Sequence, residues 1–354
     1  MDLGLGAVER EGERRAAALL DGEGRAFASL PRRDTAGQRA LLLSAQRALL
    51  GDLSTGPAAR LAVARASAPL FLALESTRHF REVAGAAAGG ALGEREAAAL
   101  LAGDRIGAVA FADAAEAARL RREGEGWRLT AGKSFVTNGP VADWIAVFAE
   151  ADGRQAVCLV SAGDEGVGPR EPMELMGLDG LPVSSLAVEG AFLPAARVLG
   201  PFEDRSPGSR YRREADLSLA LAGAGLMRRV LRAANRHAHA HRRDGRPVFS
   251  RQEVAFRLAE MASLAEAAEL LCHRAAWMVE SGARQADTVV RCAKVFCAES
   301  AERVASAGLQ VMGGEGYRRG GPAEQAYRDA KGLCLAGTTL EVARMEIADA
   351  LLSR

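Results

Sequence analysis

Aromatic residues are scarce in this sequence, and the patterns of membrane-spanning and secreted proteins are missing. Tryptophan, tyrosine and phenylalanine together make up 5% of the 354 residues. No window approaches the roughly 18 uninterrupted apolar residues that a membrane-spanning helix needs. The start, Met1 to Gly4, lacks the basic and then apolar order of a secretory signal. We therefore expect a cytoplasmic protein without a membrane partner.

Neither the charge nor the cysteine content points to a polyanionic partner or a metal site. The formal net charge is +1, so we expect no nucleic-acid partner. The cysteines are odd in number and lack the spacing of metal ligands; they are Cys158, Cys272, Cys292, Cys297 and Cys334. We expect free and mostly buried thiols in a reducing compartment.

What the sequence does contain is a helix-favouring mixture long enough for two or three domains. Apolar residues make up 49% of it, and Ala, Leu, Arg and Glu are abundant. Residues 1–104 are predicted to form a helical domain, with apolar faces over 39–50, 61–74 and 94–101. Because no polar constellation in this part suggests chemistry, we interpret it as a packing domain.

Residues 105–202 contain short apolar runs of strand length separated by turn residues. The turns include Asn138-Gly139-Pro140 and Asp152-Gly153. The runs lie at 106–112, 127–130, 134–138, 144–148, 155–160 and 184–188. This spacing predicts a β-barrel or a β-sandwich.

Residues 203–354 return to helical periodicity after a polar linker at 203–209. Helices are predicted over 215–242, 252–281, 288–312 and 339–352, joined mostly by short links. Such an arrangement is typical of an antiparallel four-helix bundle. The predicted fold class is therefore α+β.

The most specific motif is a glycine-rich segment, Gln310 to Tyr317, followed by Arg328 to Lys331. A glycine pair after a helix is by itself most often a plain cap. Here the order Q-x-x-G-G-x-G-Y, then R-D-A-K, resembles the acyl-CoA dehydrogenase family. Leu129 to Gly139 resembles that family's L-N-G-x-K-x-[WF]-I-T-N-G strand, and Gln252 to Met261 resembles its Q-x-[IV]-x-F-x-L-A-[DE]-M helix start. The resemblance covers the chain from about residue 129 onward.

The resemblance implies an N-terminal helical domain, a central small β-barrel domain and a C-terminal four-helix bundle, with FAD between the last two. Some contacts to FAD would come from a neighbouring subunit, by way of Gln310, Gly313 and Gly314. The residues that it places at the cofactor are Phe135, Thr137, His241, Arg242, Gln252, Gln310, Gly313, Gly314, Thr338 and Thr339. Each also has a plain structural interpretation, such as barrel core for Phe135.

The proton-abstracting Glu of the family is missing from both of its usual positions. In the last segment the matched residue is Gly337 or Ala336, and on the first bundle helix it is Leu217. None of these accepts a proton. Asp216, next to Leu217, is the candidate substitute base. The alternative is that Glu214 and Asp216 are solvated residues near a helix N-terminus, where negative charge is favourable.

The histidines at 237, 239 and 241 are a second group to weigh. His237 and His241 share a helix face at a spacing that can hold a metal, but the only close carboxylate is Asp244. We expect no metal. The matched position suggests instead that His241 or Arg242 faces the FAD pyrophosphate.

Three functional hypotheses remain open, and whether the chain is an enzyme is uncertain at this point. The first is α,β-desaturation of an acyl thioester (CoA or carrier protein) in lipid metabolism, with FAD as the hydride acceptor. The second is a non-catalytic subunit of a heteromeric dehydrogenase. The third is a flavin-dependent oxygenase on the same fold. The implied partners are an acyl thioester, an electron-transfer flavoprotein, and either identical subunits in a homodimer or homotetramer or a paralogous dehydrogenase.

Overall fold

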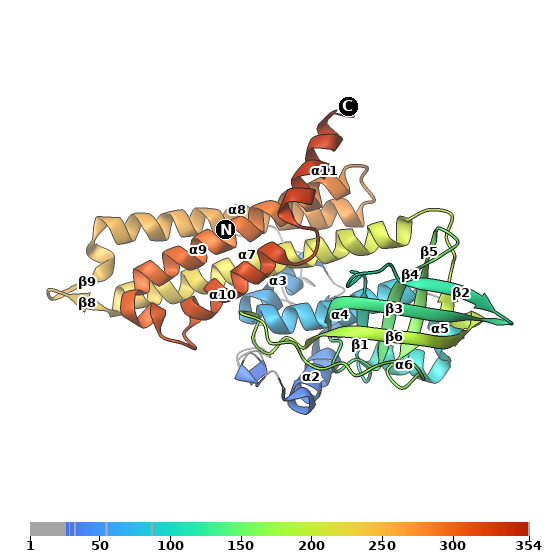
Figure 1. Cartoon of the computed structure of the whole chain (residues 1–354). Coiled ribbons are helices and arrows are strands. Elements are labelled where there is room, and N and C mark those ends of the chain that lie inside the picture. Colours follow the sequence, from blue (N-terminus) through green and yellow to red (C-terminus); the bar gives the residue numbers. More distant parts are fainter. Residues whose placement is uncertain (1–25, 28, 32, 54–55, 86–87, 353–354) are drawn as a thin grey trace.

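The computed structural model describes residues 26–27, 29–31, 33–53, 56–85 and 88–352. The expectation about Met1 to Gly4 lies outside the described residues. Helices α2 to α6 come first, then a sheet, then helices α7 to α11 (Figure 1). No helix in the described part of the chain is long and apolar enough to cross a membrane.

The N-terminal helices differ from the prediction at one point. They are α2 (Thr35–Leu53), α3 (Pro57–Ala66), α4 (Ala68–Ala84), α5 (Ala88–Leu92) and α6 (Glu94–Ala102). The single helix expected over 61–74 is interrupted at Ser67, which has an extended backbone and accepts a hydrogen bond from Leu70 N at 3.3 Å. Ser67 is thus the N-cap of α4, and Pro69 follows in the first turn, where its missing N–H costs nothing.

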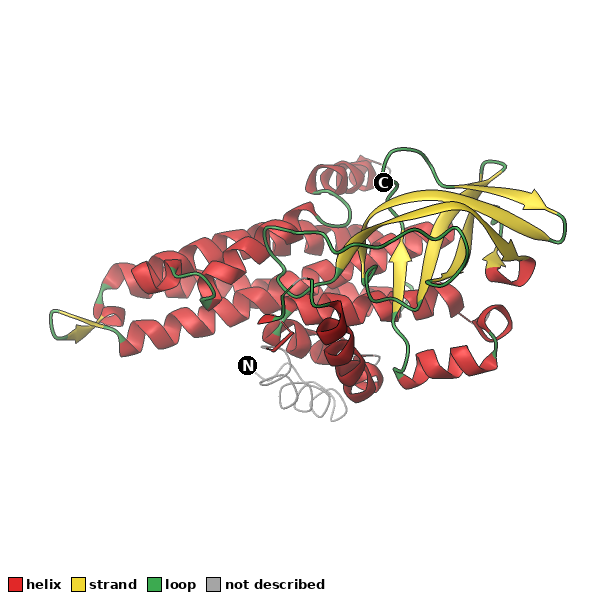
Figure 2. Cartoon of the chain, turned by 60° about the horizontal axis from the view of Figure 1, so that its bottom comes forward, coloured by secondary structure: helices red, strands yellow, loops and turns green. Residues whose placement is uncertain are grey.

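A mixed, curved sheet of seven strands forms the β domain (Figure 2). Its strands are β1 (Gly107–Ala110), β2 (Arg119–Glu123), β3 (Gly126–Thr137), β4 (Trp144–Ala151), β5 (Arg154–Ser161), β6 (Val183–Pro194) and β7 (Val198–Leu199). The order is β6-β3-β2-β4-β5-β7, and β1 pairs with β4 in parallel. The two runs expected at 127–130 and 134–138 are one strand, β3, and the charged strand β2 was not foreseen.

Strand β4 is buried on both faces, which explains its nearly continuous apolar sequence. Ile145 and Val147 belong to the main core. Trp144 and Phe148 point the other way and pack in a second cluster with Phe80 of α4. Because successive side chains of a strand point to opposite faces, β4 packs on the main core with one face and on the N-terminal helices with the other.

The bundle differs from the prediction in its fourth helix. Its long members are α7 (Ser206–Ala240), α8 (Gln252–Glu280) and α9 (Ala286–Tyr317), with the short β8 (Arg242–Arg243) and β9 (Arg246–Pro247) between α7 and α8. The fourth member is α10 (Pro322–Leu335), which the sequence reading missed; α10 packs against α7 and α9. The expected last helix is α11 (Leu340–Leu352), and it projects from the body (Figure 1).

Two further corrections concern helix ends. Helix α7 begins at Ser206, inside the segment taken as a linker. Helix α9 does not end at the glycine pair but continues to Tyr317 across a kink at Gly313, where φ is 57° and ψ is −136°. The pair is therefore a kink within a helix and not a cap.

Gly177 and the family-like segment Arg328 to Lys331 hold the β domain against the bundle. A Cβ on Gly177 would lie 2.4 Å from the backbone of Arg328, so only glycine permits this approach. Arg328 donates to Met176 O and to Asp179, both at 2.8 Å. Asp329 accepts from Leu178 N at 2.6 Å. The R-D pair of the motif thus fixes the loop before β6 onto α10.

Candidate active site

Asp216 of α7 binds the loop between α10 and α11, residues 336–339. Asp216 Oδ1 accepts a hydrogen bond from the backbone N–H of Thr338 at 3.0 Å. The Asp216 side chain is on the buried side of α7, with the residue 2% exposed. The candidate base therefore reaches the same loop in which the family-like Glu is missing.

Gly337 leaves the room that the Asp216 carboxylate fills. Its φ of 69° is in the left-handed region, and a Cβ there would lie 2.8 Å from Asp216 Oδ1 and 2.6 Å from Leu219 Cδ1. A side chain at 337 and the carboxylate at 216 therefore compete for the same space. In this chain the carboxylate comes from the helix and not from the loop.

Several charged side chains surround this carboxylate. Burial raises the pKa of Asp216, while the hydrogen bonds from Thr338 and the charges of Lys294 and Arg212 oppose that rise. Arg212 also donates to Glu346 of α11 at 2.9 Å, and Glu346 pairs with Arg291 of α9. Three helices, α7, α9 and α11, thus contribute charged residues around the buried carboxylate.

Burial excludes the alternative of solvated acids near a helix N-terminus. Helix α7 begins ten residues before Asp216, so both acids lie well inside it. Glu214 is largely buried and forms an ion pair with Arg78 of α4 at 3.3 Å. Residues two positions apart point in nearly opposite directions on a helix, and Glu214 accordingly faces α4 while Asp216 faces the loop.

Phe135 is the β-domain residue whose geometry suits a planar ligand. It lies in an irregularity of the β3–β6 ladder, between Lys133 and Val136, and has a φ of 52°. A left-handed backbone is unfavourable for an aromatic residue. Phe135 is 66% exposed and therefore lies outside the core, which excludes the plain core interpretation. An exposed, oriented aromatic ring fits one face of a flavin.

Thr137, two residues on, is half-buried beside α4. Its carbonyl accepts a hydrogen bond from Ser76 Oγ at 3.1 Å. Of the two loop threonines, Thr338 is buried at the Asp216 site, and Thr339 is exposed at the start of α11.

The other cofactor candidates lie at the opposite end of the bundle from the sheet (Figure 1). His241 ends α7, Arg242 is in β8, and Gln252 begins α8. Gln310, Gly313 and Gly314 are in the last turns of α9. Helix α7 alone is about 50 Å long at ~1.5 Å per residue, so one cofactor cannot join both ends within one chain. The far group is thus separated along the bundle from the residues near the sheet.

Gly314 has no structural reason to be glycine within the described part of this chain. It has no left-handed φ, and a Cβ on it would meet nothing within 4 Å. An exposed helical glycine without such a reason is consistent with close approach by something outside the chain.

The histidines form no metal site among the described residues. His237 and His241 stack with their ring centroids 5.0 Å apart. His239 turns away and stacks on Phe249.

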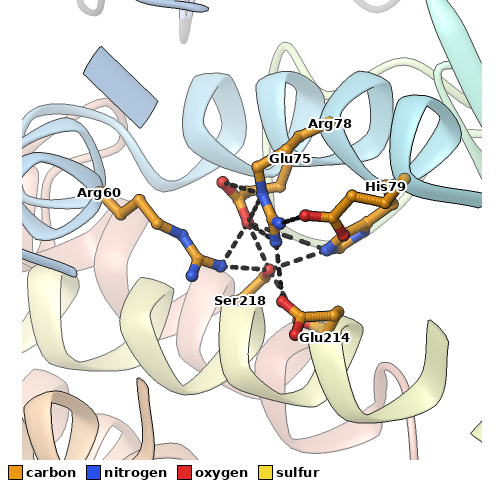
Figure 3. A network of polar contacts seen from close by, with 7 residues as sticks. Arg60, Glu75, Arg78, His79, Glu214 and Ser218 are labelled. Carbon is orange, nitrogen blue, oxygen red and sulfur yellow. Dashed lines mark hydrogen bonds and ion pairs between the residues drawn. The ribbon is translucent and has the colours of Figure 1, made fainter. Parts of the chain in front are cut away.

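A buried ionic network joins α3, α4 and α7, and sequence reasoning missed it (Figure 3). Glu75 is its centre: it pairs with Arg60 and with Arg78 at 2.9 Å, and it accepts from Ser218 Oγ at 2.6 Å. Burial would raise the pKa of Glu75, but the charges of Arg60 and Arg78 hold it well below the usual range. The network links α3 and α4 of the N-terminal part to α7 of the bundle, a contact that the sequence analysis did not predict.

His79 completes the network. Its Nε2 lies 3.2 Å from Ser218 Oγ. Burial, and then the charge of Arg78, lower the pKa of His79 to about 3. The Ser–His–Glu grouping is not a nucleophilic triad, because Glu75 contacts Ser218 directly and does not orient the far nitrogen of the histidine. The only sequence signal was the i, i+3 and i+4 spacing of Glu75, Arg78 and His79 on one helix face.

Comparison with known proteins places this geometry in a family. The acyl-CoA dehydrogenase middle-domain model matches residues 109–191, and the C-terminal-domain model matches 215–352. The 3-(aryl)acrylate reductase of Clostridium sporogenes is 31% identical over 67% of this chain and 64% of its own length. The benzylmalonyl-CoA dehydrogenase of Aromatoleum aromaticum is 30% identical over 70% of this chain and 68% of its own length. The chain thus spans about two thirds of the curated relatives that it matches.

Among solved structures, a glutaryl-CoA dehydrogenase from Mycobacterium smegmatis in complex with FADH2 superposes with a TM-score of 0.86. The match covers 99% of this chain and 96% of that one at 20% identity, which shows a common fold. Together with the family models and the curated relatives, this confirms the resemblance noted in the sequence. The chain belongs to the acyl-CoA dehydrogenase family.

Proposed function

We propose that this protein is a FAD-dependent dehydrogenase that forms the α,β double bond of an acyl thioester, with Asp216 as the base. The observation that carries the proposal is the Asp216 carboxylate at the Thr338 amide, in the space that Gly337 leaves open. Family membership and the FADH2 complex of the structural neighbour support FAD. When bound, FAD would accept the hydride from the β carbon.

The residues of this chain would divide the remaining work. The Asp216 carboxylate would take the proton from the carbon α to the thioester carbonyl. The Thr338 amide holds Oδ1 of that carboxylate and so fixes its direction. Phe135 and Thr137 would border the flavin ring, and burial of Asp216 among α7, α9 and the loop keeps water from competing for the carboxylate.

We also propose that the working assembly has more than one subunit, with Gln310, Gly313 and Gly314 of one subunit at the cofactor of another. The separation of the two cofactor groups along the bundle supports this. The partner is either an identical subunit or a paralogous dehydrogenase. Native mass spectrometry of the FAD-loaded protein alone would reveal a homo-oligomer. An electron-transfer flavoprotein is the proposed electron acceptor.

Anaerobic titration of the FAD-loaded protein with acyl thioesters tests the activity. We expect loss of the visible flavin absorbance in the native protein, and a rate lower by about 10²-fold or more in Asp216→Asn. Glu214→Gln is the matched control, because it changes an acid on the same helix that faces α4; its rate should stay close to native. Failure of CoA and carrier-protein thioesters alike to reduce the flavin would sink the proposal.

A further inference from the structure

Lys294 of α9 is a buried lysine that none of the roles above uses, and it binds the same segment of the chain as the proposed base. The residue is fully buried, and its ammonium group donates a hydrogen bond to the backbone carbonyl of Leu333. It forms no ion pair with any carboxylate in the described part of the chain. Burying an ammonium group without a counter-charge costs several kcal/mol, so the surroundings of Lys294 need explanation.

Two features of the fold compensate this charge. Leu333 is in the last turn of α10, where the helix presents unpaired carbonyls and partial negative charge. The second feature is the Asp216 carboxylate, whose charge favours the ammonium form of Lys294. Burial is the larger effect and lowers the pKa of Lys294 to about 8.

The two residues hold opposite ends of one loop. Lys294 binds the end of α10 at Leu333, and Asp216 binds the beginning of the next segment at Thr338. Between them lie Ala336 and Gly337, the positions where the family-like base is missing. A shift of either side chain would move this loop.

Other ionisable groups also face Asp216, but each has another partner or no charge. Arg212 of α7 is paired with Glu346 of α11. Tyr211, also on α7, is buried, and burial together with the Asp216 charge raises its pKa above the usual range. Cys297 of α9 and Cys334 of α10 lie on the Lys294 side, where they hydrogen-bond to backbone carbonyls. Among the described residues, Lys294 is therefore the one cation near Asp216 that forms no ion pair with another carboxylate.

We propose that Lys294 is a positioning residue for the Asp216 carboxylate, keeping it ionised by its buried positive charge while it fixes the α10 end of the loop. The inference rests on the proposed function for its consequence in catalysis. Its physical content, the protonation state of Asp216, does not depend on turnover.

Infrared titration of the carboxyl group in the flavin-free protein tests the proposal. The Asp216 signal is identified as the band of the protonated acid that disappears in Asp216→Asn. We expect Lys294→Met to raise the apparent pKa of this group by one unit or more. Lys294→Arg, which keeps the charge, should restore it toward the native value. Lys331→Met removes an exposed lysine that is paired with Glu302, and it should leave the Asp216 signal unchanged.

Kinetics supply the second readout. In Lys294→Met, the acidic limb of the pH profile for flavin reduction should move upward by the same amount, with kcat lowered and KM for the thioester nearly unchanged. An Asp216 pKa that stays the same in Lys294→Met overturns the inference, even if the native protein reduces its flavin. A shifted pKa in a protein that no thioester reduces would leave the inference standing and remove the proposed function.

Discussion

The Asp216 carboxylate fills the space that a side chain at position 337 would need: its Oδ1 lies 2.8 Å from where a Cβ on Gly337 would be. A larger residue in the loop and an acid at 216 on the helix are therefore alternatives. This chain has a glycine in the loop and the acid on the helix. This relation makes Asp216 the best candidate for the base, and it can be tested by substitutions at Asp216 or at Gly337.

Replacing Gly337 by alanine should destabilise the protein. The methyl group would meet Leu219 and Asp216, and the left-handed φ of 69° adds strain. We expect a loss of about 2 kcal/mol or more in the free energy of unfolding, measured by urea denaturation. Gly320→Ala is the control, because Gly320 has a φ of 81° but open space around it; it should cost only ~1 kcal/mol. Equal losses in the two variants would contradict the crowding argument.

Acidification should destabilise the protein through His79. The folded-state pKa of His79 lies at about 3, below its usual 6.5. The unfolded chain therefore binds the extra proton first, and stability present above pH 6.5 is lost as the pH falls toward 3, by at most ~1.4 kcal/mol per pH unit. His79→Gln should flatten this part of the stability profile.

The matched variant is His239→Gln, since His239 is exposed at the far end of the bundle. It should keep the native slope. Glu75 adds to the acid loss, because its folded-state pKa is also depressed, but it acts below its unfolded value of 4.5. A slope between pH 6.5 and 4.5 that survives in His79→Gln would assign the effect to another group.

Phe135→Gly should separate stability from cofactor binding. The ring is exposed and its backbone is left-handed, so the change relieves strain and opens no cavity. We expect a change in stability of the flavin-free protein within about 0.5 kcal/mol, whereas a core Phe would cost ~3–5 kcal/mol on truncation. FAD affinity, followed by flavin fluorescence, should fall at least tenfold. Asp152→Gly, at an exposed left-handed turn residue, should leave FAD affinity unchanged.

Gly314→Ala should leave the isolated subunit intact or stabilise it. Its Cβ would meet nothing within 4 Å, and alanine is favoured over glycine in a helix by ~0.5–1 kcal/mol. If another subunit's cofactor approaches this surface, the same change should weaken FAD retention in the assembled protein. Size-exclusion chromatography with flavin absorbance measures both. Unchanged assembly and FAD content would remove Gly314 from the proposed interface.

Local patterns in the sequence were sufficient for the type and order of most elements. The strands β4 and β5 and the helices α8 and α9 follow from apolar runs and periodicity, which burial enforces locally. The ordered motifs around Gly139, Gln252 and Gly313 were enough to identify the family. Helix α10 was missed because its buried face includes the polar residues Gln325 and Asp329, which interrupt the apolar periodicity.

The contacts between segments that are far apart in the sequence could not be predicted and came only from the tertiary structure. Nothing in the sequence brings Glu75 to Ser218, Gly177 to Arg328, or Lys294 to Leu333, because these contacts depend on how helices and loops pack after they form. The sequence by itself determined that this chain has the family's fold and lacks the family's usual base. Only the tertiary structure decided that Asp216 is buried at the Gly337 loop, because the direction of a helical side chain depends on which face the packing buries.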